Sequence, residues 1–407
     1  MTGHATPRNT LRFIPARISP REYNLRVQAQ PPFRFGQIVS PEYFVGRQTE
    51  LASLVTDLSA GVNVVLIAPR RYGKSSLVVR ALEELDQLGV PSAYVDLERT
   101  PSKERFATHL AHAMYDGLLG PRQQALQRAT EWFSQLRVRP RISLTEAGKP
   151  AFEFVGSAPQ VDIDATIERL LELPETLALE HDKRVVVVFD EFQEVLGLDP
   201  TLPARMRSVF QRQDHVAHVF LGSRQRLLRH VFAERRQPLY RLARPMALNP
   251  IGPEEFGPFI RARFAGGRSQ ISPEAVADLL QVTAGHPNDT QELAHFTWAR
   301  AVAERRRATQ DTVRLALNDV VTAESARFVL IWESLTAVQR RVASAIAAAS
   351  GRGVYTQEVR SQFQLGDSQL VQKAVRRLVE LELVEAVGRG AYKVPDVFFR
   401  AWLSRPA

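Results

Sequence analysis

The strongest constraint on the fold is the segment Ala68-Pro69-Arg70-Arg71-Tyr72-Gly73-Lys74-Ser75-Ser76, which separates an apolar run from an amphipathic one. The run VNVVLI ahead of it predicts a buried strand, and SLVVRALEEL after it predicts a helix. A loop in this context is the P-loop arrangement, with alanine in place of the usual first glycine, and its backbone N–H groups bind phosphate at a helix N-terminus. We expect Gly73 to allow close backbone approach, Lys74 to reach the β- and γ-phosphates, and Ser75 to bind Mg²⁺.

Short valine-rich runs with helical stretches between them predict a parallel sheet that is buried on both faces, and hence an α/β fold. These runs lie at residues 62–67, 93–97, 185–190 and 216–222, and a further strand is predicted at 245–251. A hairpin-like insert at 139–144 and 151–156 interrupts the pattern. Ligands of such sheets bind beyond the carboxyl ends of the strands, so the residues that end each run are the candidates for chemistry.

The strand predicted at 185–190 ends in two carboxylates, Asp190 and Glu191, as a Walker B motif requires. We expect Asp190 to hold Mg²⁺, directly or through water, and Glu191 to orient and polarise the attacking water as a general base. Two acidic residues at the end of a strand are also typical of side chains that are simply exposed to solvent. The P-loop upstream, however, favours the catalytic interpretation.

Three further residues are candidates for contacts to the γ-phosphate. Ser223 ends the strand at 216–222 and would either hydrogen-bond the γ-phosphate or the water, or cap the next helix. Arg241 and Arg244 precede the last predicted strand and are candidates for an arginine finger, acting in cis or from a neighbouring chain. Most of the ten arginines between 201 and 250 must be solvated surface.

The second half of the chain predicts a different organisation. Helices are expected at 253–264, 273–283, 288–306 and 310–321, several of them opened by proline or serine. A helical stretch at 323–334 then leads to three short helices, at 339–349, 356–363 and 370–381, and to two short strands around 388–390, which is the pattern of a winged helix. We therefore predict a basic arm (1–40), a P-loop ATPase domain (41–250), a helical lid-type domain (251–334) and a winged helix-turn-helix domain (335–407).

The third helix of the C-terminal module presents a polar face that is predicted to contact double-stranded DNA. Its members and the wing arginine are Gln369, Gln372, Lys373, Arg376, Arg377 and Arg389. In a helix-turn-helix such a face enters the major groove, and basic side chains contact phosphates. The alternative is a winged helix that contacts protein or covers the ATPase domain.

The charge distribution supports a polyanionic partner. The net charge is +9, and the excess lies at the two ends: residues 1–40 hold six Arg and one Glu, and residues 335–407 hold eleven basic and six acidic residues. The middle is close to neutral, which favours docking of nucleic acid at the ends. However, Arg outnumbers Lys 47 to 6, which also indicates a compositional bias.

Several classes of protein are excluded or disfavoured. The absence of cysteine excludes disulfides, thiolate metal sites and a cysteine nucleophile. Apolar runs are only strand-length, which argues against a membrane span. The arginine- and proline-rich start has no apolar core typical of a secretory signal, so we expect a cytoplasmic protein.

Taken together, the motifs resemble those of the archaeal-type ATPases, a branch of the STAND group of AAA-like P-loop NTPases. The matching segments are Phe44-Val45-Gly46-Arg47 with Glu50, Pro69-Arg70-Arg71-Tyr72-Gly73-Lys74-Ser75-Ser76, Phe189-Asp190-Glu191-Phe192-Gln193, Leu221-Gly222-Ser223, Pro238-Leu239-Tyr240 and Gly285-His286-Pro287. The resemblance implies that the first segment touches adenine and ribose, and that His286 and Pro287 face the nucleotide. Asn288 and Asp289 replace an aromatic pair often seen in this family.

These features predict an ATP- and Mg²⁺-dependent, slowly hydrolysing switch whose nucleotide state controls the DNA-binding module. The alternatives are an oligomeric, self-associating ATPase motor acting on nucleic acid and a nucleotide-dependent adaptor for protein assembly. The intact Asp190–Glu191 pair argues against an inactive adaptor.

Overall fold

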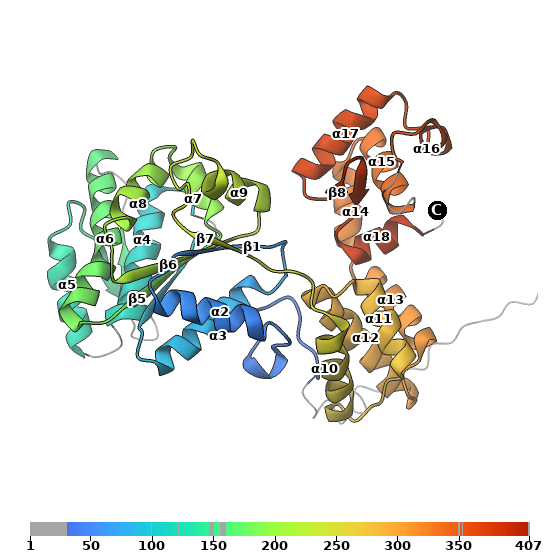
Figure 1. Cartoon of the computed structure of the whole chain (residues 1–407), viewed down its shortest axis with the longest axis horizontal. Coiled ribbons are helices and arrows are strands. Elements are labelled where there is room, and N and C mark those ends of the chain that lie inside the picture. Colours follow the sequence, from blue (N-terminus) through green and yellow to red (C-terminus); the bar gives the residue numbers. More distant parts are fainter. Residues whose placement is uncertain are drawn as a thin grey trace, which may run out of the picture.

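The computed structural model describes residues 31–405 apart from 99, 120–122, 146–149, 155–159, 349–350 and 352. The chain forms a domain with a central sheet, followed by a helical domain and a C-terminal domain (Figure 1). Residues 1–30 of the basic arm predicted at 1–40 therefore lie outside the described part of the chain. No helix in the described part of the chain combines the length and apolar character needed to cross a bilayer.

The central sheet has five parallel strands in the order β2-β5-β6-β1-β7. Their bounds are β1 Val64–Ile67, β2 Ser92–Asp96, β5 Val185–Asp190, β6 Val216–Gly222 and β7 Arg244–Ala247. The predicted bounds of β5 and β6 are confirmed to the residue, and those of the other strands shift by one to four residues. Because all strands are parallel, their carboxyl ends meet at one edge, which positions the site.

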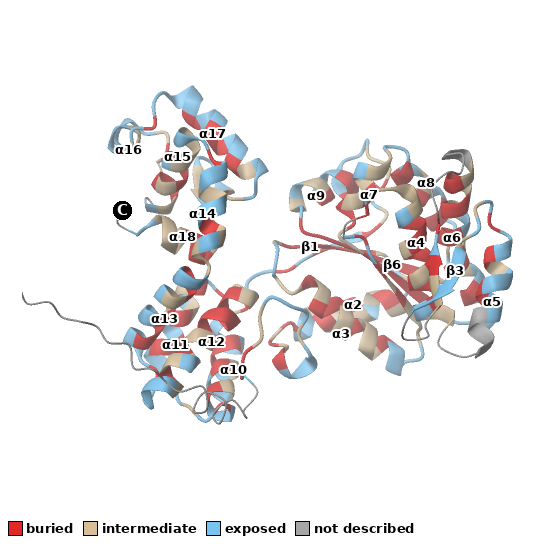
Figure 2. Ribbon diagram, turned by 180° about the vertical axis from the view of Figure 1, so that it is seen from behind, coloured by how far each residue is buried: buried red, intermediate tan, exposed pale blue. Residues whose placement is uncertain are grey.

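Helices cover both faces of this sheet, as the predicted α/β fold requires (Figure 2). Side chains alternate between the faces along each strand: Val64 and Leu66 pack on one side, and Val65 and Ile67 pack on the other. The first face is covered by α2 Gln48–Ser59 and α3 Lys74–Gln87. The second is covered by α4 Lys103–Met114, α6 Gln160–His181, α7 Gln193–Leu198, α8 Leu202–Phe210 and α9 Gln225–Ala233.

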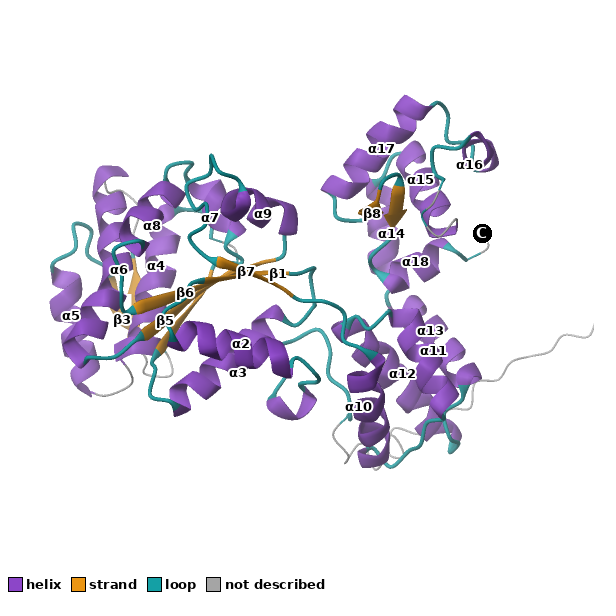
Figure 3. Ribbon diagram, viewed as in Figure 1, coloured by secondary structure: helices purple, strands orange, loops and turns teal. Residues whose placement is uncertain are grey.

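The insert between β2 and β5 contains the predicted hairpin. It consists of the short π-helix η2 Tyr115–Leu119, helix α5 Gln123–Ser134 and the antiparallel strands β3 Arg141–Leu144 and β4 Pro150–Glu153. Residues 146–149, between these two strands, lie outside the described residues. The insert packs at the end of the sheet domain farthest from the C-terminal domain (Figures 1 and 3).

The helical domain consists of α10 Pro253–Gly266, α11 Pro273–Thr283, α12 Pro287–Glu304 and α13 Gln310–Ala323, close to the predicted bounds. The end of the predicted arm is part of this fold rather than an extension from it, because Phe33 is buried in the core of the helical domain. The backbone N–H of Gly36 donates to Asn288 Oδ1 in α12 at 2.8 Å. That of Val39 donates to Ser76 Oγ in α3 at 3.3 Å. Residues 31–39 and the short 3₁₀-helix η1 Pro41–Tyr43 thus lead from the helical domain to the P-loop helix.

The C-terminal domain has the predicted order of helices and wing strands (Figure 3). Its elements are α14 Ser325–Ser334, α15 Ala337–Ala348, α16 Gln357–Gln362, α17 Ser368–Glu380, β8 Glu385–Gly388, β9 Ala391–Lys393 and α18 Val397–Leu403. Phe328 of α14 packs on Phe399 and Trp402 of α18, so the aromatic C-terminal run docks inside the domain. One continuous apolar core joins this domain to the helical domain.

Candidate nucleotide site

The P-loop follows β1 and turns into α3 at the carboxyl edge of the sheet. Arg71 and Gly73 adopt left-handed backbone conformations, with φ of 61° and 80°, which helps to point successive N–H groups inward. Ala68 is buried and is not left-handed, so this position requires a small side chain rather than glycine. The side chains of Arg70 and Arg71 are exposed.

Lys74 is folded onto the loop that it is predicted to serve. Its Nζ donates to the carbonyl oxygens of Ala68 at 3.1 Å and of Pro69 at 2.9 Å. Burial lowers its pKa, and the charge of Glu191 opposes that effect. The amine is therefore held at the loop, beside the predicted phosphate position.

Asp190 is the centre of a compact group of oxygen atoms. Its Oδ2 accepts a hydrogen bond from Ser75 Oγ at 2.9 Å and another from the hydroxyl of Tyr94, while its Oδ1 accepts from the backbone N–H of Glu191 at 2.8 Å. Burial, followed by the charge of Asp190, raises the pKa of Tyr94, which keeps this hydroxyl a donor. A hydroxyl beside one carboxylate suits Mg²⁺, which commonly takes one or two carboxylates together with substrate phosphates and water.

No group of three or more His, Asp or Glu side chains suited to a metal occurs among the described residues. A metal at this edge would therefore take its remaining ligands from phosphate and water. Ser75 and Asp190 fit that role.

Glu191 lies beside this group, in a constrained conformation. Its φ is 52°, which is uncommon for a residue other than glycine. Its Oε2 accepts hydrogen bonds from Ser223 Oγ at 3.1 Å and from Nε2 of Gln193. Ser223 is buried and does not cap α9, whose N-cap is Arg224, so the alternative predicted for Ser223 is not adopted. The structure thus brings the predicted base and the predicted sensor serine into direct contact.

The helical domain reaches this edge through the start of α12. Pro287 opens the helix, and His286 caps it by accepting from the backbone N–H of Asp289 at 3.3 Å. The His286 ring packs edge-on against Tyr72 of the P-loop, with centroids 4.6 Å apart, and bonds to the backbone of Arg70. His286 therefore lies against the P-loop itself.

The segment at 44–47 lies between two cores. Phe44 packs on the α2–α3 side of the sheet, whereas Val45 is buried in the core of the helical domain. Gly46 has a φ of 63°, and a Cβ there would meet the Glu255 carboxylate at 2.9 Å. Arg47 is buried, pairs with Glu50 at 2.9 Å, and leaves Nη2 without a hydrogen-bond partner among the described residues. A buried guanidinium nitrogen without a hydrogen-bond partner is a vacant donor suited to a polar ligand group.

The two arginine-finger candidates are not at this edge. Arg244 begins β7 and pairs with Val64 at the start of β1, which places it at the amino edge of the sheet. Its guanidinium bonds to Asp57 and to Ser53 Oγ. Arg241 lies three residues earlier, with its guanidinium over the Tyr240 ring. The expectation that either acts in cis is wrong for this conformation, because parallel strands place the start of β7 opposite the P-loop. A contact from a neighbouring chain stays a prediction.

The predicted DNA-binding side chains are all exposed. They are Gln369, Gln372, Lys373, Arg376 and Arg377 on α17, and Arg389 between β8 and β9. Arg377 forms an ion pair with Glu380, with 3.0 Å between Nη1 and Oε2. The opposite face of α17 is buried in the domain through Val371, Ala374, Val375 and Leu378.

Sequence reasoning missed four residues at or near this site. Tyr94 contacts Asp190 from β2, and Gln193 contacts Glu191, although Gln193 was noted only as part of a motif. On α12, burial raises the pKa of Asp289 and of Glu292 to about 7. Burial also lowers the pKa of His286 to about 4, so the 3.2 Å contact between His286 and Asp289 is not an ion pair at neutral pH.

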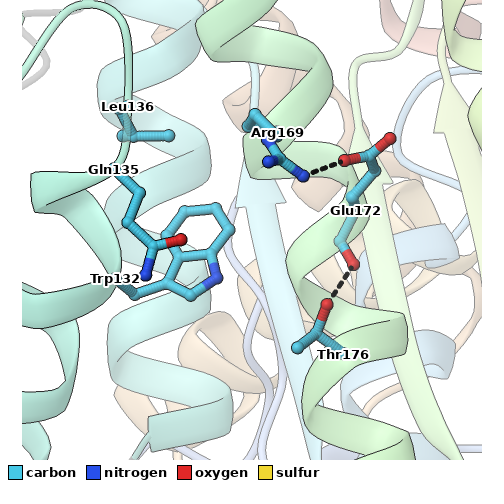
Figure 4. A pocket seen from close by; sticks show the side chains of 6 residues that line it. All are labelled: Trp132, Gln135, Leu136, Arg169, Glu172 and Thr176. Carbon is cyan, nitrogen blue, oxygen red and sulfur yellow. Dashed lines mark hydrogen bonds and ion pairs between the residues drawn. The ribbon is translucent and has the colours of Figure 1, made fainter.

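A shallow pocket elsewhere in the sheet domain contains none of the predicted residues. It lies between α5 and α6 and is lined by Trp132, Gln135, Leu136, Arg169, Glu172 and Thr176 (Figure 4). Three of its polar residues bond to one another: Arg169 pairs with the Glu172 carboxylate at 3.2 Å, and Thr176 Oγ1 donates to the Glu172 carbonyl at 3.5 Å. We assign no ligand to it.

Comparison with known proteins agrees with this geometry. The family model of an ATPase domain predominantly from Archaea matches residues 44–293, and that of a probable winged helix domain matches residues 326–405. The winged-helix match thus includes α14. A comparison with curated protein sequences found no match.

Two solved structures share the fold of most of the chain. A Walker-type ATPase of Pyrococcus abyssi superposes with a TM-score of 0.63 at 15% identity, covering 91% of this chain and 99% of that one. The Orc1 protein of Aeropyrum pernix, solved in complex with DNA, superposes with a TM-score of 0.50 at 17% identity, covering 91% and 96%. At these identities the comparison establishes the fold alone.

Proposed function

Because this chain belongs to the family of ATPase domains found predominantly in Archaea, we propose that it is an ATP- and Mg²⁺-dependent switch. In this proposal it hydrolyses ATP slowly, and its nucleotide state controls double-stranded DNA binding by the winged helix. The observation that carries the ATPase part is the contact between Ser75 and Asp190, which joins the P-loop to the strand that ends in Glu191.

The phosphates bind at the P-loop backbone and Lys74. Lys74 exchanges its bonds to the loop carbonyls for bonds to the β- and γ-phosphate oxygens. Ser75 and Asp190 hold the metal, which neutralises charge on the phosphates when bound. The unpartnered guanidinium nitrogen of Arg47 and the position of His286 beside Tyr72 support contacts from both residues to the rest of the nucleotide.

Glu191 acts as the general base, and its hydrogen bonds account for slow turnover. A carboxylate oxygen that already accepts bonds from Ser223 and Gln193 is less available to accept one from water. A γ-phosphate that takes the Ser223 hydroxyl removes one of these bonds, and Glu191 is then freer to accept a proton from water.

Contacts between the helical and C-terminal domains support a response of the winged helix to the nucleotide. The helical and C-terminal domains share one apolar core, with Arg327 paired to Asp396 at 2.9 Å and Arg400 donating to the carbonyl of Val282 at 3.4 Å. The same helical domain contacts the P-loop through His286. A movement of α12 against the P-loop would therefore carry the winged helix with it.

The test is DNA affinity measured with an ATP analogue, with ADP and without nucleotide, in the Glu191→Gln variant to prevent turnover. Allosteric coupling of this kind typically changes affinity about 5- to 150-fold, and DNA must change ATP affinity by the same factor. Arg376→Glu/Arg377→Glu should weaken DNA binding in every state. Three equal affinities would reject the switch and leave an ATPase and a DNA-binding module that act independently.

A further inference from the structure

Helix α9 and the turn after it carry a dense group of unpaired positive charge. Between residues 224 and 241 the chain has six arginines and one acid, Glu234. The six are all exposed: Arg224, Arg226, Arg229, Arg235, Arg236 and Arg241. None of them has an ion-pair partner among the described residues, and Glu234 is bonded to His230 instead. We call this group the α9 arginine surface.

This surface is solvent-facing because of the amphipathic pattern of α9. Leu228, Val231 and Phe232 are buried against the sheet, so Arg226 and Arg229, one helical turn apart, point away from it. The chain continues the exposed face into the turn with Arg235 and Arg236. Many other arginines of the described chain are neutralised locally, as Arg80, Arg205 and Arg300 are by neighbouring acids.

The position of α9 relates it to the nucleotide site and to the C-terminal domain. The helix begins two residues after Ser223, whose hydroxyl bonds to Glu191. In Figures 1 and 2, α9 lies at the end of the sheet domain nearest the C-terminal domain, whereas α5 lies at the far end. Helix α9 is therefore on the side of the ATPase domain that is nearer to the domain that carries α17.

We propose that the α9 arginine surface is a second nucleic-acid contact, which binds the phosphate backbone of duplex DNA held by the winged helix. Exposed arginines without ion-pair partners, on a helix and on the turn after it, suit phosphates, and such contacts fix position without reading sequence. The inference rests on the proposed function for its ligand, but it adds a binding surface on the ATPase domain. It also couples Ser223 to the DNA contact, because a shift at the end of β6 moves the start of α9.

The test compares full-length variants that carry the same change of charge. Arg226→Glu/Arg229→Glu alters the proposed surface, and Arg376→Glu/Arg377→Glu alters α17. The control is Arg128→Glu/Arg137→Glu, on and just after α5, where both arginines are exposed and have no ion-pair partner among the described residues. Arg226→Gln/Arg229→Gln repeats the test without adding negative charge, and nucleotide affinity and melting temperature verify that each variant is folded.

Binding of a fluorescent duplex is measured as a function of salt. Loss of two phosphate contacts lowers the slope of log K against log salt by about 2, and weakens binding about 10- to 100-fold near 0.1 M salt. We expect this loss in both α9 variants and a much smaller one in the α5 control. Equal affinity and slope in the wild type and the α9 variants would overturn the inference.

The outcomes separate this inference from the proposed function. Weaker DNA binding in the α17 variant alone would reject the α9 contact and retain winged-helix binding. Weaker DNA binding in the α9 variants alone would retain the α9 contact and reject winged-helix binding. Absence of wild-type binding would reject both. If the α9 variants instead lose only ATP turnover that depends on protein concentration, the arginines act on a second copy of the chain, and the DNA contact is rejected.

Discussion

The contact between Tyr94 and Asp190 allows a sharp test of the metal site. Tyr94→Phe removes one hydroxyl and leaves the ring in place on β2. The Asp190 carboxylate then keeps its bonds from Ser75 and from the Glu191 backbone, but loses the one that approaches from the neighbouring strand. Tyr94 is thus a positioning residue, since it would act on the metal only through Asp190.

The magnitude follows from the kind of bond that is lost. A hydrogen bond to a charged group contributes about 1.5–3 kcal/mol. Loss of a partner that orients a metal ligand typically costs about 10- to 100-fold in metal affinity. We therefore expect the Mg²⁺ concentration for half-maximal nucleotide affinity to rise about 10- to 100-fold. Turnover at saturating Mg²⁺ should stay near the wild-type value, because Glu191 and Lys74 are untouched.

The assay is titration of a fluorescent ATP analogue at a series of Mg²⁺ concentrations, with turnover measured in parallel. Tyr72→Phe is the matched control, because Tyr72 contacts His286 through its ring. An unchanged Mg²⁺ requirement in Tyr94→Phe, or an equal shift in Tyr72→Phe, would refute the reasoning.

Three further predictions follow from the same site. Lys74→Ala should abolish ATP binding in a calorimetric titration while the chain remains folded; wild-type affinity would contradict the P-loop assignment. Glu191→Gln should keep ATP affinity and lose about 10²- to 10⁴-fold in turnover, and wild-type turnover would assign the base elsewhere. Burial and then the charge of Asp396 raise the pKa of Asp289 from 3.8 to about 7, so this group stabilises the fold below about pH 4 and loses that contribution as the pH rises through 7. His286 has a lowered pKa of about 4, so its contribution to stability rises with pH between 4 and 6.5. The melting temperature of Asp289→Asn should therefore exceed that of the wild type by more at pH 8 than at pH 5. An equal difference in melting temperature at both pH values would contradict the buried carboxylate.

Local sequence patterns predicted the five strands of the central sheet, although the ends of β1, β2 and β7 differ from the prediction by one to four residues. Valine-rich runs fixed β5 and β6 to the residue, and proline after a polar residue fixed the start of α11. Asp190, Glu191 and Ser223 were found because each directly follows or ends an apolar run, and parallel strands bring such residues to one edge. The same rule, applied to Arg244, would have placed it at the other edge, because that residue begins its strand.

What could not be predicted depends on which strands are neighbours. Tyr94 reaches Asp190 because β2 pairs with β5 and aligns Asp96 with Asp190. A short stretch of sequence around either strand does not specify that pairing, because the whole insert separates β2 from β5 in the chain. Gln193 was visible in its motif, but its bond to Glu191 depends on the left-handed backbone at Glu191.

Residues 288 and 289 show how a departure from a family pattern acquires a physical explanation. An aromatic pair at these positions could stack on a ligand, whereas Asn288 instead accepts from the Gly36 backbone at 2.8 Å. Asp289 supplies the backbone N–H that His286 caps. The start of α12 thus binds the segment 31–39, and the end of this segment contacts Ser76 in the P-loop helix. A segment that reads as an irregular basic arm therefore ties the helical domain to the P-loop, and a change at either end of it alters the geometry in which His286 meets Tyr72.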